Sequence, residues 1–83
     1  MKVTIYTTTT CPFCNMLKVY LEGKGITYSE KLVDQDDAAR IEMATKSKGY
    51  LGVPYSVFTK EDGQEVSVIG FDQARIDSVL ESN

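Results

Sequence analysis

The chain has two cysteines, and both lie in one tetrapeptide, Cys11-Pro12-Phe13-Cys14. A disulfide that stabilises a fold usually closes a long loop, because the chain entropy that it removes grows with loop length. A bridge over two intervening residues removes little chain entropy, so this pair would contribute little as a structural cross-link. Thiol–disulfide exchange needs one thiolate that attacks a disulfide and a second thiol that resolves the mixed disulfide. The spacing therefore predicts redox chemistry, with Cys11 attacking and Cys14 resolving.

Two neighbouring elements are expected to position this pair. Residues 2–6 are rich in β-branched and aromatic types and predict a strand, with Val3 and Ile5 on one face. Pro12 suits the first turn of a helix, where its missing N–H is no loss. Cys11 then lies at the helix N-terminus, where unpaired N–H groups and the positive end of the helix dipole favour a thiolate. Cys14 follows one turn later, within reach of a mixed disulfide on Cys11, while Pro12 and Phe13 shape the surface that a partner meets.

The rest of the chain continues the alternation of strands and helices. The expected inner face of the first helix consists of apolar residues at helical spacing: Phe13, Met16, Leu17, Tyr20 and Leu21. Gly23 and Gly25 are expected to end this helix. Residues 26–33 predict a second strand, and Asp34, Asp36 and Asp37 predict the acidic start of a second helix that stops at Gly49. The expected inner face of this second helix is Ala38, Ile41, Ala44 and Thr45.

A hairpin and a short helix complete the expected order. Residues 55–59 and 65–69 predict two strands joined by a turn at Asp62-Gly63. Ile76, Val79 and Leu80 indicate a terminal helix. The order βαβ, α, ββ, α predicts an α/β fold with a four-stranded mixed sheet and helices on both faces, in which the βαβ unit has a right-handed crossover. A chain of 83 residues has room for one domain, so residues 1–83 are expected to form it.

Composition excludes several classes of function. The net charge is −3 and the pI is near 4.8, so a basic nucleic-acid footprint is absent. No apolar run approaches the ~20 residues that cross a bilayer, so no membrane partner is expected. Residues 1–10 lack the long apolar stretch of a secretory signal. The chain has no histidine, which excludes histidine-based acid–base catalysis and histidine-rich metal sites. The alternatives for the cysteine pair are half of a zinc site, whose other two ligands are missing, and two inert thiols.

Pro54 is the second informative position. It follows Val53 and precedes a predicted strand, where it removes one hydrogen-bond donor and fixes the entry of the chain. Because an X-Pro bond is cis in only ~5–6% of cases, the residues alone leave the isomer open.

These motifs together resemble the glutaredoxins over nearly the whole chain. The residues that carry the resemblance are Ile5-Tyr6-Thr7, Thr10-Cys11-Pro12-Phe13-Cys14, Lys18, Gly49, Val53-Pro54, Phe58 and Gly70. The resemblance implies a thioredoxin fold and a cis Pro54 facing the cysteines. It also implies a groove at Val53 that pairs with a bound peptide or glutathione, an exposed nucleophile Cys11 and a buried Cys14. A cytoplasmic location is implied as well.

Three parts of the sequence depart from the usual glutaredoxin pattern. Thr8 stands where a lysine is common, Leu51-Gly52 replaces an arginine and a threonine, and Phe71 before Asp72 replaces the second glycine of a pair. These changes remove groups that would pair with the carboxylates of glutathione. Gly49-Tyr50 and Gly70-Phe71 are instead similar to NrdH-type redoxins, which donate electrons to ribonucleotide reductase and are reduced by thioredoxin reductase. Phe71 and Asp72 therefore join Pro12, Phe13, Val53 and Pro54 as expected substrate-binding residues.

The leading hypothesis is a monomeric thiol–disulfide oxidoreductase that reduces protein disulfides or glutathione mixed disulfides through a reversible Cys11–Cys14 disulfide. No tightly bound cofactor or metal is expected, and glutathione or thioredoxin reductase would supply electrons. The alternative is an NrdH-like donor to ribonucleotide reductase. Two other classes are an iron–sulfur carrier, in which Cys11 of each subunit and glutathione hold a cluster between two copies, and an adaptor that docks through the acidic segment from Asp34.

Overall fold

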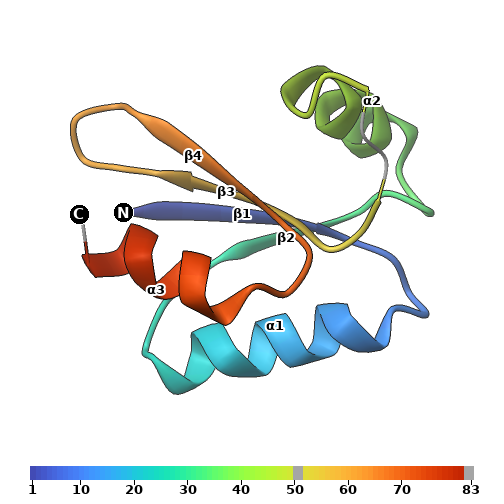
Figure 1. The fold of residues 1–83 in the computed structure, drawn as a ribbon. Helices are drawn as coiled ribbons and strands as arrows, with labels where there is room; N and C mark the ends of the chain where they lie inside the picture. The colour runs from blue at the N-terminus through green and yellow to red at the C-terminus, as the bar shows by residue number, and fades with distance from the viewer. Residues whose placement is uncertain (50–51, 82–83) are drawn as a thin grey trace.

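Four strands form one mixed sheet in the order β2-β1-β3-β4. The computed structural model describes residues 1–49 and 52–81 (Figure 1). Its elements in chain order are β1 (Lys2–Thr7), α1 (Pro12–Gly23), β2 (Ser29–Leu32), α2 (Asp37–Lys46), β3 (Tyr55–Thr59), β4 (Glu65–Ile69) and α3 (Gln73–Glu81). Strand β1 pairs parallel with β2 and antiparallel with β3, which pairs antiparallel with β4. The predicted element order and mixed sheet are confirmed.

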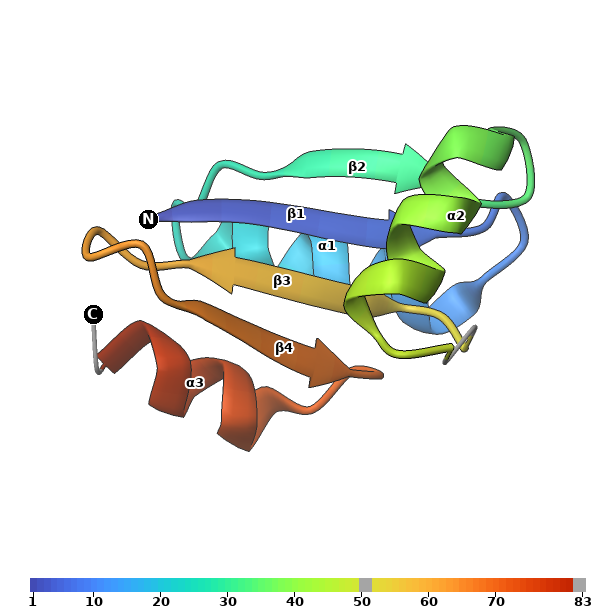
Figure 2. The ribbon, with the colours of Figure 1, turned by 90° about the horizontal axis from the view of Figure 1, so that it is seen from above.

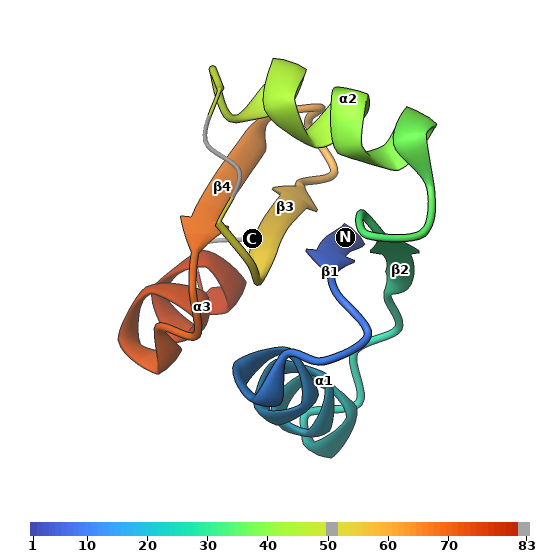
Figure 3. The same cartoon turned by 90° about the vertical axis from the view of Figure 1, so that its right-hand side faces the viewer.

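Helices cover both faces of the sheet, as the sequence predicts. Figures 1 and 3 show α1 and α3 together on one face and α2 alone on the other, and Figure 2 shows α2 crossing above the strands. The larger core lies between the sheet and α1 and α3; it contains Val3, Ile5, Leu17, Leu21, Phe58, Val68, Ile76 and Val79. The smaller core lies under α2 and contains Tyr6, Met43, Tyr55 and Val57. In residues 1–49 and 52–81, no helix is long and apolar enough to cross a bilayer.

Helix α1 is bounded by signals that the sequence carries. Cys11 is its N-cap and Pro12 its first residue. At the other end Gly25 has φ +73°, and the N–H groups of Gly25 and Ile26 donate to the carbonyls of Glu22 and Leu21, each at 3.0 Å. This pair of bonds is a Schellman motif. Because it uses the Ile26 N–H, the second strand cannot begin at Ile26, and β2 is shorter than the predicted range 26–33.

The predicted inner face of α1 is partly wrong. Cys14, Leu17 and Leu21 are buried, whereas Phe13 and Met16 are 59% and 48% exposed. The predicted apolar face of α1 was wider than the face that is buried, because apolar residues also lie at the edges of that face. Phe13 and Met16 instead lie beside the cysteines on the outer surface.

The predicted inner face of α2 is wrong. Ala39 and Met43 are buried, while Ile41 is 60% exposed and Ala38 and Thr45 are also exposed. The helix begins at Asp37, because the carboxylate of Asp36 accepts hydrogen bonds from the N–H groups of Ala38 and Ala39.

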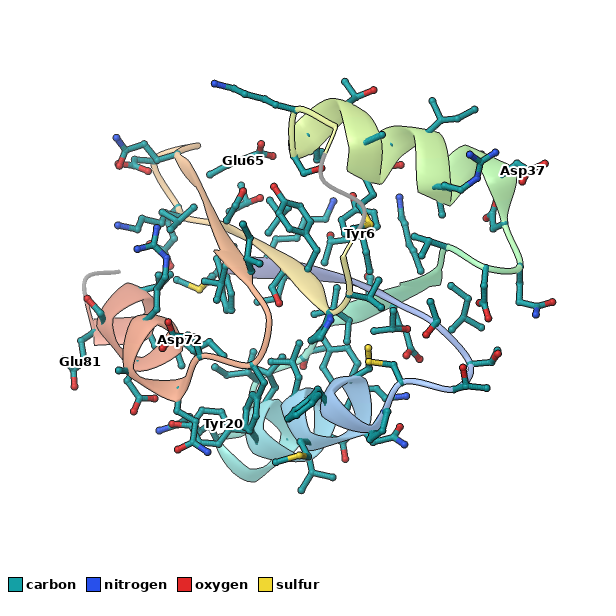
Figure 4. All side chains as sticks on the ribbon, turned by 45° about the vertical axis from the view of Figure 1, so that its right-hand side comes forward. Tyr6, Tyr20, Asp37, Glu65, Asp72 and Glu81 are labelled. Atoms are coloured by element: carbon teal, nitrogen blue, oxygen red, sulfur yellow. The ribbon has the colours of Figure 1, made fainter. Side chains whose placement is uncertain are left out.

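The face of α2 that meets the sheet contains charged residues, which an apolar pattern cannot detect. The Tyr6 hydroxyl donates to Glu42 at 2.6 Å, and Lys31 of β2 donates to the same carboxylate at 2.8 Å. One turn later, Lys46 forms an ion pair with Glu65 of β4 at 3.1 Å. Figure 4 shows Tyr6 pointing from β1 into the space below α2. Burial, followed by the hydrogen bond to Glu42, raises the pKa of Tyr6, so its hydroxyl remains a donor.

We expect Ser56→Ala to stabilise the fold. The Ser56 side chain is fully buried, pairs across the sheet with Ile5 and Val68, and has no hydrogen-bond partner for Oγ among the described residues. Because an unsatisfied buried hydroxyl is costly, its removal is expected to raise the free energy of unfolding by about 1 kcal/mol. Urea denaturation measures this change.

Ser67→Ala is the matched control, since the Ser67 Oγ accepts a hydrogen bond from the Tyr55 hydroxyl at 2.8 Å. Removing this acceptor is expected to destabilise the protein by a similar amount. A loss of stability in Ser56→Ala would contradict the prediction.

Candidate active site

Three chain segments leave the sheet at the same end. Tyr6, near the end of β1, pairs with Tyr55 at the start of β3, and Tyr55 pairs with Ile69 at the end of β4. The loop into α1, the segment before β3 and the loop after β4 must therefore meet there, and Figure 3 looks onto this end of the sheet. These segments carry the expected site residues: Cys11, Pro12, Phe13, Cys14, Val53, Pro54, Phe71 and Asp72.

The two cysteines are free thiols in contrasting environments. Cys11 is half-buried, while Cys14 is only 1% exposed. The backbone N–H of Cys14 donates to the Sγ of Cys11 at 3.2 Å, so the Cys11 side chain caps the first turn of α1. A donor aimed at the sulfur and the positive end of the helix dipole both favour negative charge there. This arrangement leaves an accessible sulfur at Cys11, held at the helix N-terminus.

Cys14 has the opposite character. Burial, with a further contribution from hydrogen bonding with Cys11, raises the pKa of the Cys14 thiol to about 12. The backbone of Thr8 and the charge of Lys18 oppose this rise. At neutral pH Cys14 is therefore a protonated thiol with little access to solvent. The site thus holds one reachable sulfur and one protected sulfur a single turn apart.

The Val53–Pro54 segment enters β3 and is anchored to the neighbouring elements. The Val53–Pro54 peptide bond is cis, as the family resemblance implies. Pro54 is buried, and its carbonyl accepts a hydrogen bond from the N–H of Gly70 at 2.8 Å. Val53 packs against the smaller core below α2. Tyr50 and Leu51, two of the positions compared with the family pattern, lie outside the described residues.

Phe71 and Asp72 connect β4 to α3. The Phe71 ring meets the Tyr20 ring edge-to-face, with centroids 5.6 Å apart and planes at 73°, and Figure 4 shows Tyr20 between α1 and α3. Together they close an apolar groove of about 400 Å³ that is lined by Asn15, Met16, Val19, Tyr20, Phe71 and Gln73. Asp72 caps α3, because its carboxylate accepts from the Arg75 N–H at 3.1 Å. The edge of the groove formed by Tyr20 and Phe71 is therefore aromatic and apolar.

Two polar contacts near the cysteines were missed by reasoning from the sequence. The hydroxyl and the N–H of Thr9 both donate to the carboxylate of Asp34, at 2.7 and 3.1 Å, which ties the loop before Cys11 to the end of β2. The hydroxyl of Thr7 donates to Glu30 at 2.7 Å, and Glu30 forms an ion pair with Lys18 at 2.9 Å. Thr7 and Glu30 are 23 residues apart, and Thr9 and Asp34 are 25 residues apart, so no local pattern could have revealed these contacts.

Asp34 is therefore part of the site's scaffold and not of a helix. The hydrogen bonds from the Thr9 hydroxyl and N–H lower the pKa of Asp34, which keeps the carboxylate charged and bound to the loop.

Among residues 1–49 and 52–81, no three or more cysteine, aspartate or glutamate side chains cluster in a way that could hold a metal ion.

Comparison with known proteins identifies the family. The family model for glutaredoxins matches residues 3–62. A probable glutaredoxin of Synechocystis sp. is 44% identical over 62 residues, which cover 75% of this chain and 56% of that protein. This chain thus spans little more than half the length of that relative. An uncharacterized glutaredoxin-like protein from the rubredoxin operon of Clostridium pasteurianum is 38% identical over 95% of this chain and 97% of its own length.

Solved structures show the same fold. The thioredoxin-like protein BC3987 superposes with a TM-score of 0.78 at 28% identity, over 93% of this chain and 97% of that one. The glutaredoxin-like NrdH-redoxin of Escherichia coli, described as having a thioredoxin-like activity profile, superposes with a TM-score of 0.73 at 25% identity, over 95% of each chain. The fold is therefore the thioredoxin fold, and the family match covers most of the chain. This protein belongs to the glutaredoxin family.

Proposed function

We propose that this protein is a dithiol oxidoreductase that reduces protein disulfides or glutathione mixed disulfides through a reversible Cys11–Cys14 disulfide. The observation that carries the proposal is the pairing of an accessible Cys11 sulfur, held by an N–H donor at a helix N-terminus, with a buried free thiol one turn later. Glutaredoxin-family membership supports thiol–disulfide exchange as the general reaction.

The exchange proceeds in two displacements. The Cys11 thiolate attacks a sulfur of the substrate disulfide, so a bond from Cys11 to substrate forms and the substrate S–S bond breaks. Cys14 then attacks the Cys11 sulfur, which forms the Cys11–Cys14 disulfide and releases the second substrate sulfur as a thiol. The substrate gains two electrons, and a thiol reductant returns them to the protein.

The surface around Cys11 favours a protein partner over glutathione. In the sequence, Thr8 and Leu51 supply no cation for the carboxylates of glutathione and Gly52 supplies no hydroxyl, while the Phe71 ring packs against Tyr20. Phe13 is 59% exposed beside Cys11, so the rim offers apolar contacts. These features support the second candidate, an NrdH-like electron donor to ribonucleotide reductase that is reduced by thioredoxin reductase. Val53, Pro54 and Asp72 would belong to the surface that binds the substrate in either case.

The proposal includes no tightly bound cofactor and a monomeric protein. It also places the reaction in the cytoplasm, where glutathione and thioredoxin systems keep thiols reduced. An iron–sulfur carrier would instead need glutathione to complete a cluster between two copies. Reconstitution with iron and sulfide in the presence of glutathione tests this point, and cluster absorption would contradict the proposal.

The choice of reductant can be measured directly. We expect thioredoxin reductase with NADPH to reduce the oxidised protein faster than glutathione with glutathione reductase, because Thr8 and Leu51 stand where the glutaredoxin pattern has a lysine and an arginine. NADPH consumption follows both reactions. Faster reduction by glutathione would favour the glutaredoxin role, and reduction by neither would contradict both candidates.

Alkylation distinguishes the two thiols. At neutral pH we expect iodoacetamide to modify the native reduced protein at Cys11 alone, because Cys14 is buried and its pKa is raised to about 12. Peptide mass spectrometry locates the modification. Cys14 should react only after denaturation, and early modification of Cys14 would contradict the assignment of roles.

Substitution of each cysteine separates attack from resolution. We expect Cys14→Ser to accumulate a stable mixed disulfide with substrate, since the attacking thiolate remains and the resolving thiol is lost. Cys11→Ser should lose at least about a hundredfold in exchange rate, because the remaining thiol is almost wholly protonated at neutral pH. Intact-mass analysis detects the trapped species, and retained exchange in Cys11→Ser would refute the proposed function.

A further inference from the structure

A group of three polar side chains lies next to the resolving cysteine and outside the groove described above. The group consists of Thr7 of β1, Lys18 of α1 and Glu30 of β2. The Lys18 ammonium is 2.9 Å from Glu30 Oε2, and the Thr7 hydroxyl donates to the same oxygen at 2.7 Å. Thr7 is fully buried, and the Lys18 and Glu30 side chains are about three-quarters buried, at 27% and 28% exposure. This pair is therefore less screened by water than an ordinary surface ion pair.

The group is placed to act on Cys14. Lys18 follows Cys14 by four residues in α1, so the two side chains lie on the same face of the helix, one turn apart. The charge of Lys18 lowers the pKa of Cys14, against the larger effect of burial. The other groups that act on this thiol are the Cys11 sulfur and the backbone of Thr8.

Glu30 and Thr7 hold the lysine in place. Partial burial opposes ionisation of Glu30, but the hydrogen bonds from Thr7 and Lys18 and the charge of Lys18 together lower its pKa. Glu30 is thus a carboxylate at neutral pH and keeps its ion pair with Lys18. A lysine without such a partner would extend its flexible side chain into water, where its charge is strongly hydrated and screened.

We propose that Lys18 is a positioning residue for the resolution step, in which its ammonium, held by Glu30 and Thr7, stabilises the Cys14 thiolate as it forms. The inference rests on the proposed function, because it concerns the second displacement of the same reaction. In that step the Cys14 thiol loses its proton and its sulfur bonds to Cys11. The bond between Cys11 and the substrate breaks, and the departing sulfur takes the electron pair and a proton. Lys18 forms no covalent bond.

The two displacements can be followed separately with dithiobis(nitrobenzoate) as the disulfide. Attack by Cys11 releases a first coloured nitrothiobenzoate, and resolution by Cys14 releases a second, so stopped-flow absorbance records both rates in one reaction. In Lys18→Gln we expect the second release to be slower by about threefold at neutral pH, because the loss of the cation lowers the thiolate fraction of Cys14 and higher nucleophilicity offsets this only in part. The pH midpoint of the second release should rise. The first release should change by less than twofold.

Two variants make the test specific. Lys18→Arg retains the positive charge and should restore most of the second rate and the wild-type pH midpoint. Lys24→Gln removes the same charge from the other end of α1, where Lys24 pairs with Asp77 at 3.3 Å, and should leave both releases unchanged. Thermal unfolding of each variant verifies that the fold is intact.

The outcomes separate the two proposals. If wild-type protein gives both releases but Lys18→Gln and Lys24→Gln behave alike, the role of Lys18 is refuted and the proposed function stands. An Arg variant that folds but remains slow would also refute it. If the wild-type protein gives no second release, the proposed function itself fails.

Discussion

The hydrogen bond from the Cys14 N–H to the Cys11 sulfur is the interaction on which the rest of the site depends. It exists because β1 ends at Thr7 and α1 begins at Pro12, so that Cys11 occupies the N-cap position. An N-cap side chain normally satisfies an unpaired donor of the first turn. Here the acceptor is a sulfur that also faces solvent. The same bond therefore caps the helix and fixes the position of the accessible sulfur.

The packing of α1 against the sheet gives the two cysteines different environments. Leu17 and Leu21 draw one face of α1 into the larger core, and Cys14 lies on that face one turn earlier. Burial follows directly, and it protects the resolving thiol from outside reactants while raising its pKa. A cation is then needed close to the buried sulfur during resolution. The Lys18–Glu30 ion pair, anchored by Thr7, lies at the edge of the same face.

The second helix illustrates how polar contacts override an apolar pattern. The Tyr6 hydroxyl lies on the α2 side of the sheet and donates to Glu42 of the helix. Ala39 and Met43 are buried on this side of α2, whereas Ile41 faces solvent. An unpaired buried hydroxyl is costly, which favours the orientation in which Tyr6 meets Glu42. Hydrophobic periodicity alone therefore predicted the wrong face.

The sequence by itself determined the element order, the helix N-terminus at Cys11 and the hairpin at Asp62-Gly63, because each depends on local spacing, capping and turn residues. The buried Cys14 that the family resemblance implies is confirmed, whereas only the tertiary structure decided the orientation of α2 and the contacts Thr9–Asp34 and Lys18–Glu30. These depend on which strands lie side by side, and parallel pairing of β1 with β2 joins residues more than 20 positions apart. Local pattern carries no information about such partners, so the position of the cysteine pair could be predicted from four residues while its electrostatic setting could not.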